Sequence, residues 1–195
     1  MNFPLTLSFK ILALASQINV QDAGGTSIAY VKQKLLKLRE DIDIFADQSQ
    51  TNLLYNIKAD RVIDFSARYT FTDGSGKVLG FIKRQGMRSL WKANYHIFDA
   101  AEKHIMSINE ENGWVKIWDS LFGELPVIGM LSGYLFHPAF LVTDPAGTQL
   151  ARLEKQPAFF EGKFQLDKRD ALKAGDETLV LLSVLMMTLL ERARG

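Results

Sequence analysis

Residues 178–190, TLVLLSVLMMTLL, decide how this chain folds. Ten of these 13 residues are Leu, Val or Met. The other three, Thr178, Ser183 and Thr188, carry small hydroxyls that can bond to carbonyls of the preceding helical turn. Charges of the sign that stabilises a helix dipole flank the stretch: Asp176, Glu177, Arg192 and Arg194. The stretch therefore predicts a helix that is apolar on all sides.

Such a helix is too short to cross a membrane. At about 1.5 Å per residue it spans roughly 20 Å, whereas the hydrocarbon layer of a bilayer is about 30 Å thick. A helix that is apolar all round and cannot span a bilayer belongs inside a protein core. We expect five of its residues to form the centre of a core plug: Leu181, Leu182, Leu185, Met186 and Leu189.

Three turn signals before this helix have the form Asp-x-x-Gly, at residues 22–25, 73–76 and 144–147. Asp can bond its own backbone at the first turn position, and Gly is free to take a positive φ at the fourth. Each turn joins two apolar-rich runs, which predicts three hairpins. Their strands are residues 17–21 with 27–34, 66–72 with 77–84, and 140–143 with 148–155.

The hairpins resemble one another beyond their turns. IAYVK at 28–32 echoes LGFIK at 79–83, and LARL at 150–153 echoes both more faintly. IFAD at 44–47 likewise matches IFD at 97–99, which indicates an internal duplication of a meander. Further strands are expected at 5–11, 52–58, 104–109 and 163–168, for a total of about twelve.

The spacing of these strands is too short for helical crossovers, so the sheet should be antiparallel and closed on itself. A barrel of about twelve strands is too wide for its own side chains to fill. The apolar helix at 178–190 is the segment that can fill it. The sequence thus predicts a mainly β protein, a closed antiparallel barrel around a buried C-terminal helix.

Composition limits the function more than it defines it. The chain has 195 residues, 47% of them hydrophobic and 23% charged, which is typical of one globular domain over residues 1–195. The 23 basic and 22 acidic residues give a net charge of +1, which argues against a dedicated nucleic-acid binder. The absence of Cys excludes disulfides, thiol catalysis, cysteine-ligated zinc and palmitoylation. We expect a monomer.

The N-terminus imitates a secretion signal, because Ala13-Leu14-Ala15 follows an apolar stretch. No basic region precedes that stretch, however, and Lys10 stands where the apolar core of a signal should be. Residues 5–11 also alternate apolar and polar side chains with the period of a strand. We therefore expect a first strand and a cytoplasmic protein.

Catalytic groups are sparse. His96 and His104 flank the turn at 99–103 and could lie diagonally on one face of a hairpin. With Asp99 or Glu102 they would offer a metal site, although a pair of exposed strand histidines is the favoured reading. Glu110 and Glu111 are adjacent, so on a strand they point to opposite faces and cannot share a substrate. We expect no enzyme, no cofactor and no metal.

The residues Ser89-Leu90-Trp91-Lys92-Ala93 and Ile97-Phe98-Asp99, with the terminal apolar helix, resemble the tubby-like C-terminal superfamily. The resemblance is strongest to the LURP-one-related proteins, with phospholipid scramblases as more distant relatives. It implies a twelve-stranded antiparallel barrel wrapped around a hydrophobic C-terminal helix. It implies less about function: tubby proteins bind phosphoinositide head groups and scramblases are linked to lipid translocation, whereas many members have no assigned function.

The sequence departs from the scramblase pattern in two respects. It has no cysteine that could be palmitoylated. The acidic residues before the terminal helix are also mixed with basic ones, so a calcium ion would meet cancelled charge. Scramblase-like lipid translocation therefore stays an alternative and not the main expectation.

Basic residues gather at equivalent places in the two repeats, just after the matching strands at 28–32 and 79–83. They favour reversible binding to anionic phospholipid head groups at the cytoplasmic face of a membrane. The other interpretation is that they serve solubility and edge protection. No head-group residue of tubby proteins can be matched to a position here, so the candidates come from the charge pattern: Lys32, Lys34, Lys37, Arg39, Arg84, Arg88 and Lys92.

Residues 113–136 are harder to assign. Trp114, Trp118 and Phe122 fall at helical spacing, and Pro126 ends the predicted amphipathic helix. The helix and the apolar loop after it could close one mouth of the barrel, or they could lie at a membrane interface. If part of this segment is exposed, it could also bind a protein partner, which would make the chain a protein-protein scaffold.

Overall fold

The computed structural model describes residues 1–12, 15–34, 41–61, 67–85, 94–111, 139–157 and 162–192. These residues form twelve strands, a short 3-10 helix η2 and one α-helix, α3. The elements are β1 (Leu5–Leu12), β2 (Ala15–Gln21), β3 (Ser27–Lys34), β4 (Asp41–Phe45), β5 (Leu53–Ala59), β6 (Arg68–Asp73), β7 (Val78–Arg84), β8 (Asn94–Asp99), β9 (His104–Glu110), β10 (Ala139–Thr143), β11 (Gln149–Gln156), β12 (Gly162–Lys168), η2 (Ala174–Asp176) and α3 (Glu177–Arg192).

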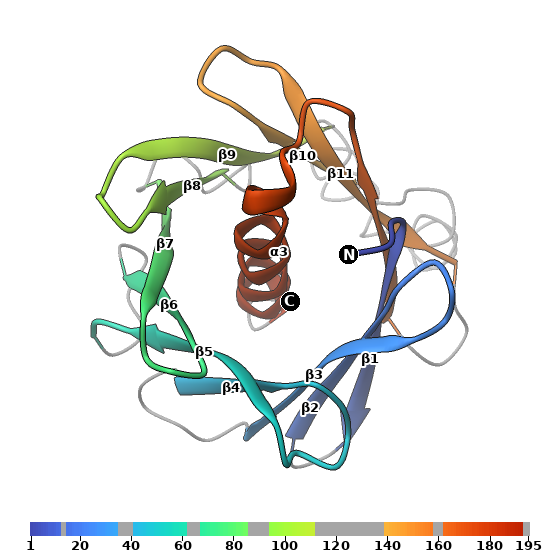
Figure 1. Ribbon diagram of the computed structural model, residues 1–195. Coiled ribbons are helices and arrows are strands. Elements are labelled where there is room, and N and C mark those ends of the chain that lie inside the picture. Colours follow the sequence, from blue (N-terminus) through green and yellow to red (C-terminus); the bar gives the residue numbers. More distant parts are fainter. Residues whose placement is uncertain are drawn as a thin grey trace, which may run out of the picture.

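The strands form a closed barrel in which every strand pairs antiparallel with its neighbours in sequence. The barrel closes where β1 pairs with β12, with Leu7 opposite Phe164. Figure 1 looks along the barrel and shows α3 inside the ring of strands. The predicted closed antiparallel barrel of about twelve strands around a C-terminal helix is thus confirmed.

The turns that join β2 to β3, β6 to β7 and β10 to β11 are the three predicted Asp-x-x-Gly turns, spaced four strands apart around the ring. In the first, the Asp22 carboxylate accepts bonds from the backbone N–H groups of Gly24 and Thr26, at 2.9 and 3.0 Å. Gly25 has a φ of 79°. The Asp side chain and the Gly backbone therefore play the parts that the sequence predicts.

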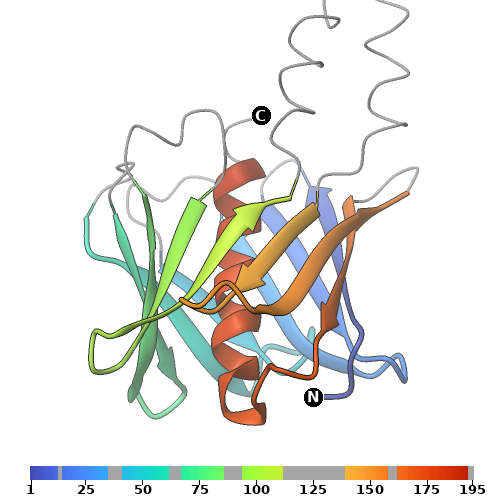
Figure 2. The ribbon, with the colours of Figure 1, turned by 90° about the horizontal axis from the view of Figure 1, so that it is seen from above.

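Two further turns follow the same plan without glycine. Asp47 begins the turn between β4 and β5, and Asp99 begins the turn between β8 and β9. Their fourth positions, Gln50 and Glu102, have positive φ values of 57° and 64°. The five Asp turns lie at one end of the barrel, which we call the turn end; the opposite end, where β3, β7 and β11 finish, is the loop end (Figure 2).

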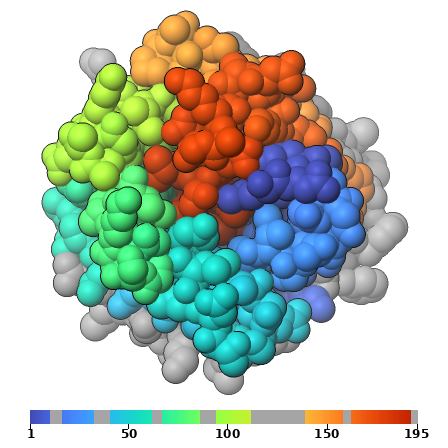
Figure 3. All heavy atoms as spheres, in the orientation of Figure 1, coloured from blue at the N-terminus to red at the C-terminus, as the bar shows by residue number. Residues whose placement is uncertain are grey.

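The core is the space between α3 and the inner faces of the strands. All five predicted plug residues are buried, with Leu182 and Leu185 at 0% exposure. They pack in one cluster with inward residues of the strands, such as Phe9, Phe71 and Tyr95. The hydroxyl of Thr188 donates to the carbonyl of Val184 at 2.7 Å, as expected for a hydroxyl in an apolar helix. Figure 3 shows how closely the atoms of the C-terminal part fill the ring at the turn end.

Polar contacts hold the two ends of α3 to the barrel wall. At the turn end, Glu177 accepts bonds from Lys168 Nζ at 2.6 Å and from the Met1 ammonium at 3.1 Å. The bond from Lys168 is the largest cause that lowers the pKa of Glu177, and the Met1 ammonium adds to it. At the loop end, the hydroxyl of Tyr95 donates to Glu191 at 2.6 Å. Packing and charge therefore both position the plug.

Residues 113–136, for which a barrel cap or an interfacial helix was expected, lie outside the described residues. Among the helices of the described segments, none combines the length and apolar character needed to cross a membrane.

Candidate functional site

The strands that precede the two predicted basic clusters finish at the same end of the barrel. Strands β3 and β7 run in the same direction, so Lys34 and Arg84, their last residues, both stand at the loop end. The two strands are separated by three others in the ring, so the clusters start at different points of one rim (Figure 2). Four of the candidates fall outside the described residues: Lys37, Arg39, Arg88 and Lys92.

Lys32 is exposed on the outer face of β3. The inner face of this strand is formed by Ala29 and Val31, which are buried in the core, so the two-residue period turns Lys32 outward. Gln17 of β2 lies directly opposite it. Lys34 pairs with Ala15 at the end of the same hairpin, and only its backbone is described.

Arg84 lies inside the barrel and not on its surface. Its side chain is only 8% exposed, because Arg84 shares the inner face of β7 with Ile82. The guanidinium is 3.8 Å from the Glu191 carboxylate and sits 5.8 Å from the ring centre of Tyr95. The exposed cation of this strand is its neighbour Lys83. Grouping the residues by closeness in sequence missed this difference, which the two-residue period of a strand predicts.

Arg84, Tyr95 and Glu191 form a buried polar contact between β7, β8 and α3. Burial raises the pKa of the Tyr95 hydroxyl, and the nearby Glu191 carboxylate raises it further. Tyr95 therefore stays a neutral donor to Glu191 at physiological pH. The arrangement fixes the end of the plug at the loop end.

His96 and His104 do lie on one face of the β8–β9 hairpin, as expected. Their rings stack with centres 4.3 Å apart and planes at 25°. His96 Nδ1 is 3.3 Å from Gln85 Nε2, and His104 Nε2 is 3.0 Å from Ser107 Oγ. Burial lowers the pKa of His96, and the neighbouring His104 lowers it further. In a stacked pair the ring nitrogens do not point at one common centre, so the stack is not arranged to hold a metal ion. No cluster of three or more metal-ligating side chains occurs in the described segments.

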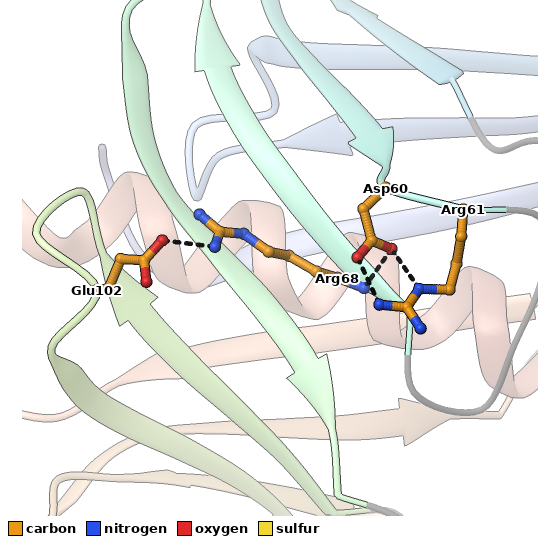
Figure 4. Close-up of polar contacts among 4 residues, drawn as sticks. All are labelled: Asp60, Arg61, Arg68 and Glu102. Carbon is orange, nitrogen blue, oxygen red and sulfur yellow. Dashed lines mark hydrogen bonds and ion pairs between the residues drawn. The ribbon is translucent and has the colours of Figure 1, made fainter.

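A row of stacked groups beside the histidines was not predicted. Phe81 and Phe98 stack at 4.6 Å with planes at 9°, and the Arg68 guanidinium lies 3.5 Å from the centre of the Phe81 ring. Arg68 also reaches Glu102 at 2.6 Å, while its backbone N–H donates to Asp60 (Figure 4). These residues come from the consecutive strands β6, β7 and β8 and from the segments next to them, so the strand register brings them together. The contacts hold Arg68 and Phe81 in place on the outer wall.

The adjacent carboxylates also point apart as predicted. Glu110 is buried on the inner face of β9. Glu111 turns outward, where Arg152 binds it at 2.9 Å. They cannot act on one substrate together.

One comparison with known proteins identifies a relationship. The model of the LURP-one-related family matches residues 27–123. This segment contains the matching stretches of the internal repeat, 28–32 with 79–83 and 44–47 with 97–99, and all seven basic candidates. No protein among the curated sequences matches the chain. Over residues 27–123, just under half of its length, the chain therefore carries a match to the LURP-one-related domain.

Proposed function

We propose that this protein is a non-catalytic module that binds anionic phospholipid head groups reversibly at the cytoplasmic face of a membrane. The observation that carries the proposal is the difference between the two ends of the barrel. Five turns at the turn end each begin with an Asp carboxylate: Asp22, Asp47, Asp73, Asp99 and Asp144. The strands that precede both basic clusters finish at the loop end. A negative surface would therefore attract the cations that follow these strands and repel the carboxylates of the turn end.

The expected strength of this binding follows from charge alone. A basic residue near an anionic leaflet contributes about 1 kcal/mol, and the attraction falls off over a Debye length of about 8–10 Å. Lys32 is exposed beside the loop end. Four more cations follow in the sequence segments that leave β3 and β7: Lys37, Arg39, Arg88 and Lys92. Arg84 is omitted because its charge already faces Glu191 inside the barrel.

Vesicle co-sedimentation at low and high salt tests the proposal. Vesicles of phosphatidylcholine with phosphatidylglycerol should bind the protein at low salt and release it at high salt. A variant with Ala in place of Lys37, Arg39, Arg88 and Lys92 should lose this binding. A control variant with Ala at three exposed cations of the turn end, Lys77, Lys103 and Arg169, should keep it. Absence of wild-type binding at low salt, or equal binding by both variants, would contradict the proposal.

The same experiment separates the alternatives. A protein-protein scaffold that uses an exposed part of residues 113–136 would bind its partner through apolar area and would keep it at high salt. Scramblase-like activity would move a labelled lipid between leaflets, and we expect none.

We also propose that the protein is not an enzyme. The competing site is the His96–His104 pair, and elemental analysis of the purified protein tests it. Stoichiometric zinc, iron or manganese that is lost in His96→Ala would overturn this part of the proposal.

A further inference from the structure

The outer faces of β7, β8 and β9 carry three basic side chains. They are Lys83, which is exposed, and the half-buried His96 and His104. The sequence of β7, VLGFIKR, contains no acidic residue. β8 and β9 contain one each: Asp99, which begins the turn between them, and Glu110, which is buried on the inner face. Apart from the turn residue Asp99, the ionisable side chains that these strands turn outward are therefore basic.

The strand register makes the three basic residues neighbours. Lys83 pairs with His96 across β7 and β8, which brings their Cβ atoms to about 4.5–5.5 Å. The His96 ring stacks on that of His104, with ring centres 4.3 Å apart. Lys83 is one residue from the loop-end terminus of β7, and His96 is two residues from that of β8. We call Lys83, His96 and His104 the Lys–His site; its Lys83 and His96 stand near the loop end.

Among the described residues, no carboxylate lies opposite or diagonal to Lys83 or His96. The residues directly opposite Lys83 are Arg68 and His96, and those opposite His96 are Lys83 and Ser107. The described diagonal neighbours of the two residues also lack a carboxylate: Thr70, Phe81, Gln85, Asn94, Phe98 and Asn109. The register therefore places no negative charge within these rows of the Lys–His site.

The carboxylates of the adjoining turn have partners of their own. The charged groups that face the histidines from neighbouring elements are Lys83 on β7, Arg68 on β6, and Asp99, Glu102 and Lys103 in the turn before His104; β10 has none. The Asp99 carboxylate accepts the backbone N–H groups of Ala101 and Lys103, at 2.9 Å each. The Glu102 carboxylate accepts a bond from Arg68 at 2.6 Å. Burial and the neighbouring His104 lower the pKa of His96, and no carboxylate is among the causes.

We infer that the Lys–His site is a proton-dependent docking surface for the phosphate groups of anionic phospholipids. The inference rests on the proposed function and adds a dependence on pH. With neutral histidines the site has one cation, Lys83, and with both histidines protonated it has three within about one Debye length. Two stacked imidazolium rings repel each other, and a phosphate that accepts hydrogen bonds from them offsets the repulsion. Anion binding and protonation of the pair therefore favour each other.

Position and chemistry both favour a membrane surface as the source of these phosphates. Lys83 stands near the loop end, and the next segment of the sequence, 86–93, contains Arg88 and Lys92. Histidine is the side chain that ordinarily changes its charge between pH 5 and 8, whereas the phosphodiester of phosphatidylglycerol stays negative. An anionic leaflet also attracts protons, which favours the charged pair at the surface. We therefore expect tighter membrane binding in acidic conditions.

Vesicle co-sedimentation at pH 7.5 and pH 5.5, at one low salt concentration, tests the inference. Wild type should bind phosphatidylglycerol vesicles between about fivefold and about 25-fold more tightly at pH 5.5, because each added charge contributes roughly a fivefold factor. The affinity of His96→Gln/His104→Gln should differ by less than about twofold between the two pH values, since lysine, arginine and ordinary carboxylates keep their charge. The matched control, His137→Gln at the third histidine of the chain, should keep the wild-type ratio. Circular dichroism at both pH values establishes that each protein is folded.

The outcomes separate the inference from the proposed function. If wild type binds equally at the two pH values, the inference is wrong and the proposed function stands. If the double variant keeps the pH dependence, or His137→Gln loses it, the proton-dependent surface lies elsewhere and the inference is wrong. If wild type binds at neither pH value, the proposed function fails. If inorganic phosphate at equal ionic strength displaces wild type from the vesicles at pH 5.5, the site takes a soluble phosphate compound and the lipid assignment is wrong.

Discussion

Gln50 and Glu102 are the residues in which local strain is most visible. Both take a positive φ at the fourth position of an Asp turn, where three equivalent turns have Gly. A side chain in this region of φ costs about 1–2 kcal/mol, and Gly avoids that cost. The register of the neighbouring strands holds these turns in the same shape without Gly.

We predict that Gln50→Gly stabilises the protein by about 0.5–1 kcal/mol. The substitution relieves the backbone strain in the folded state, and the larger conformational entropy of Gly in the unfolded chain offsets part of that gain in stability. Urea unfolding of both proteins measures it. Gln48→Gly in the same turn is the control and should give no gain, because no positive φ occurs there. A loss of stability in Gln50→Gly would show that the φ value is not a source of strain.

The stacked histidines predict a pH dependence. The pKa of His96 is lowered by burial and by His104, so the folded protein binds this proton less readily than the unfolded chain does. Stability should therefore decrease as the pH falls through the ordinary histidine value of 6.5 toward the lower folded pKa. The melting temperature of His96→Gln should fall less than that of wild type between pH 7.5 and 5.5. Parallel curves for the two proteins would contradict the assignment.

At the scale of residues, the sequence predicted the features that depend on residues close together in the chain. The three Asp-x-x-Gly turns were found because Gly marks a positive φ, and the other two were missed because Gln50 and Glu102 carry no such mark. The stack of Arg68 on Phe81 was missed because it depends on strand register. The burial of Arg84 was predictable in principle, since it shares the period of Ile82.

At the scale of elements, α3 decides whether the barrel can form. Every residue from Leu179 to Leu189 is buried, and the strands alone enclose a space that their side chains do not fill. The helix was predictable because its apolar run is unbroken and charged at both ends. Its observed range, Glu177–Arg192, extends the predicted 178–190 by residues that interact with the wall, including Glu177 and Glu191.

We predict that Leu185→Glu, or removal of the chain after Gly175, abolishes soluble folding. Leu185 is 0% exposed. A buried Leu contributes about 2 kcal/mol or more, an unpaired buried carboxylate costs several kcal/mol, and the whole stability is about 5–15 kcal/mol. Leu185→Met, which nearly keeps the volume, should cost less than about 1.5 kcal/mol. A cooperative, monomeric truncated protein in size exclusion and thermal unfolding would show that the buried-plug account is wrong.

At the scale of the whole molecule, the barrel has two unlike ends. The number of strands and their closure could be predicted because the short spacing allows no crossover. The register at the closure could not, because β1 pairs with β12 across the full length of the chain. The segments with the remaining basic candidates lie outside the described residues, so their part in binding stays a prediction.

The central claim is that the loop end meets the membrane, and a pair of labels at the two ends of one strand tests it most directly. The chain has no Cys, so Pro157→Cys at the loop end of β11 and Ala146→Cys in the turn before it each accept one polarity-sensitive fluorophore. Both positions are exposed. On addition of phosphatidylglycerol vesicles at low salt, the label at 157 should shift its emission and the label at 146 should not. A response from position 146, or from neither label, would contradict the account.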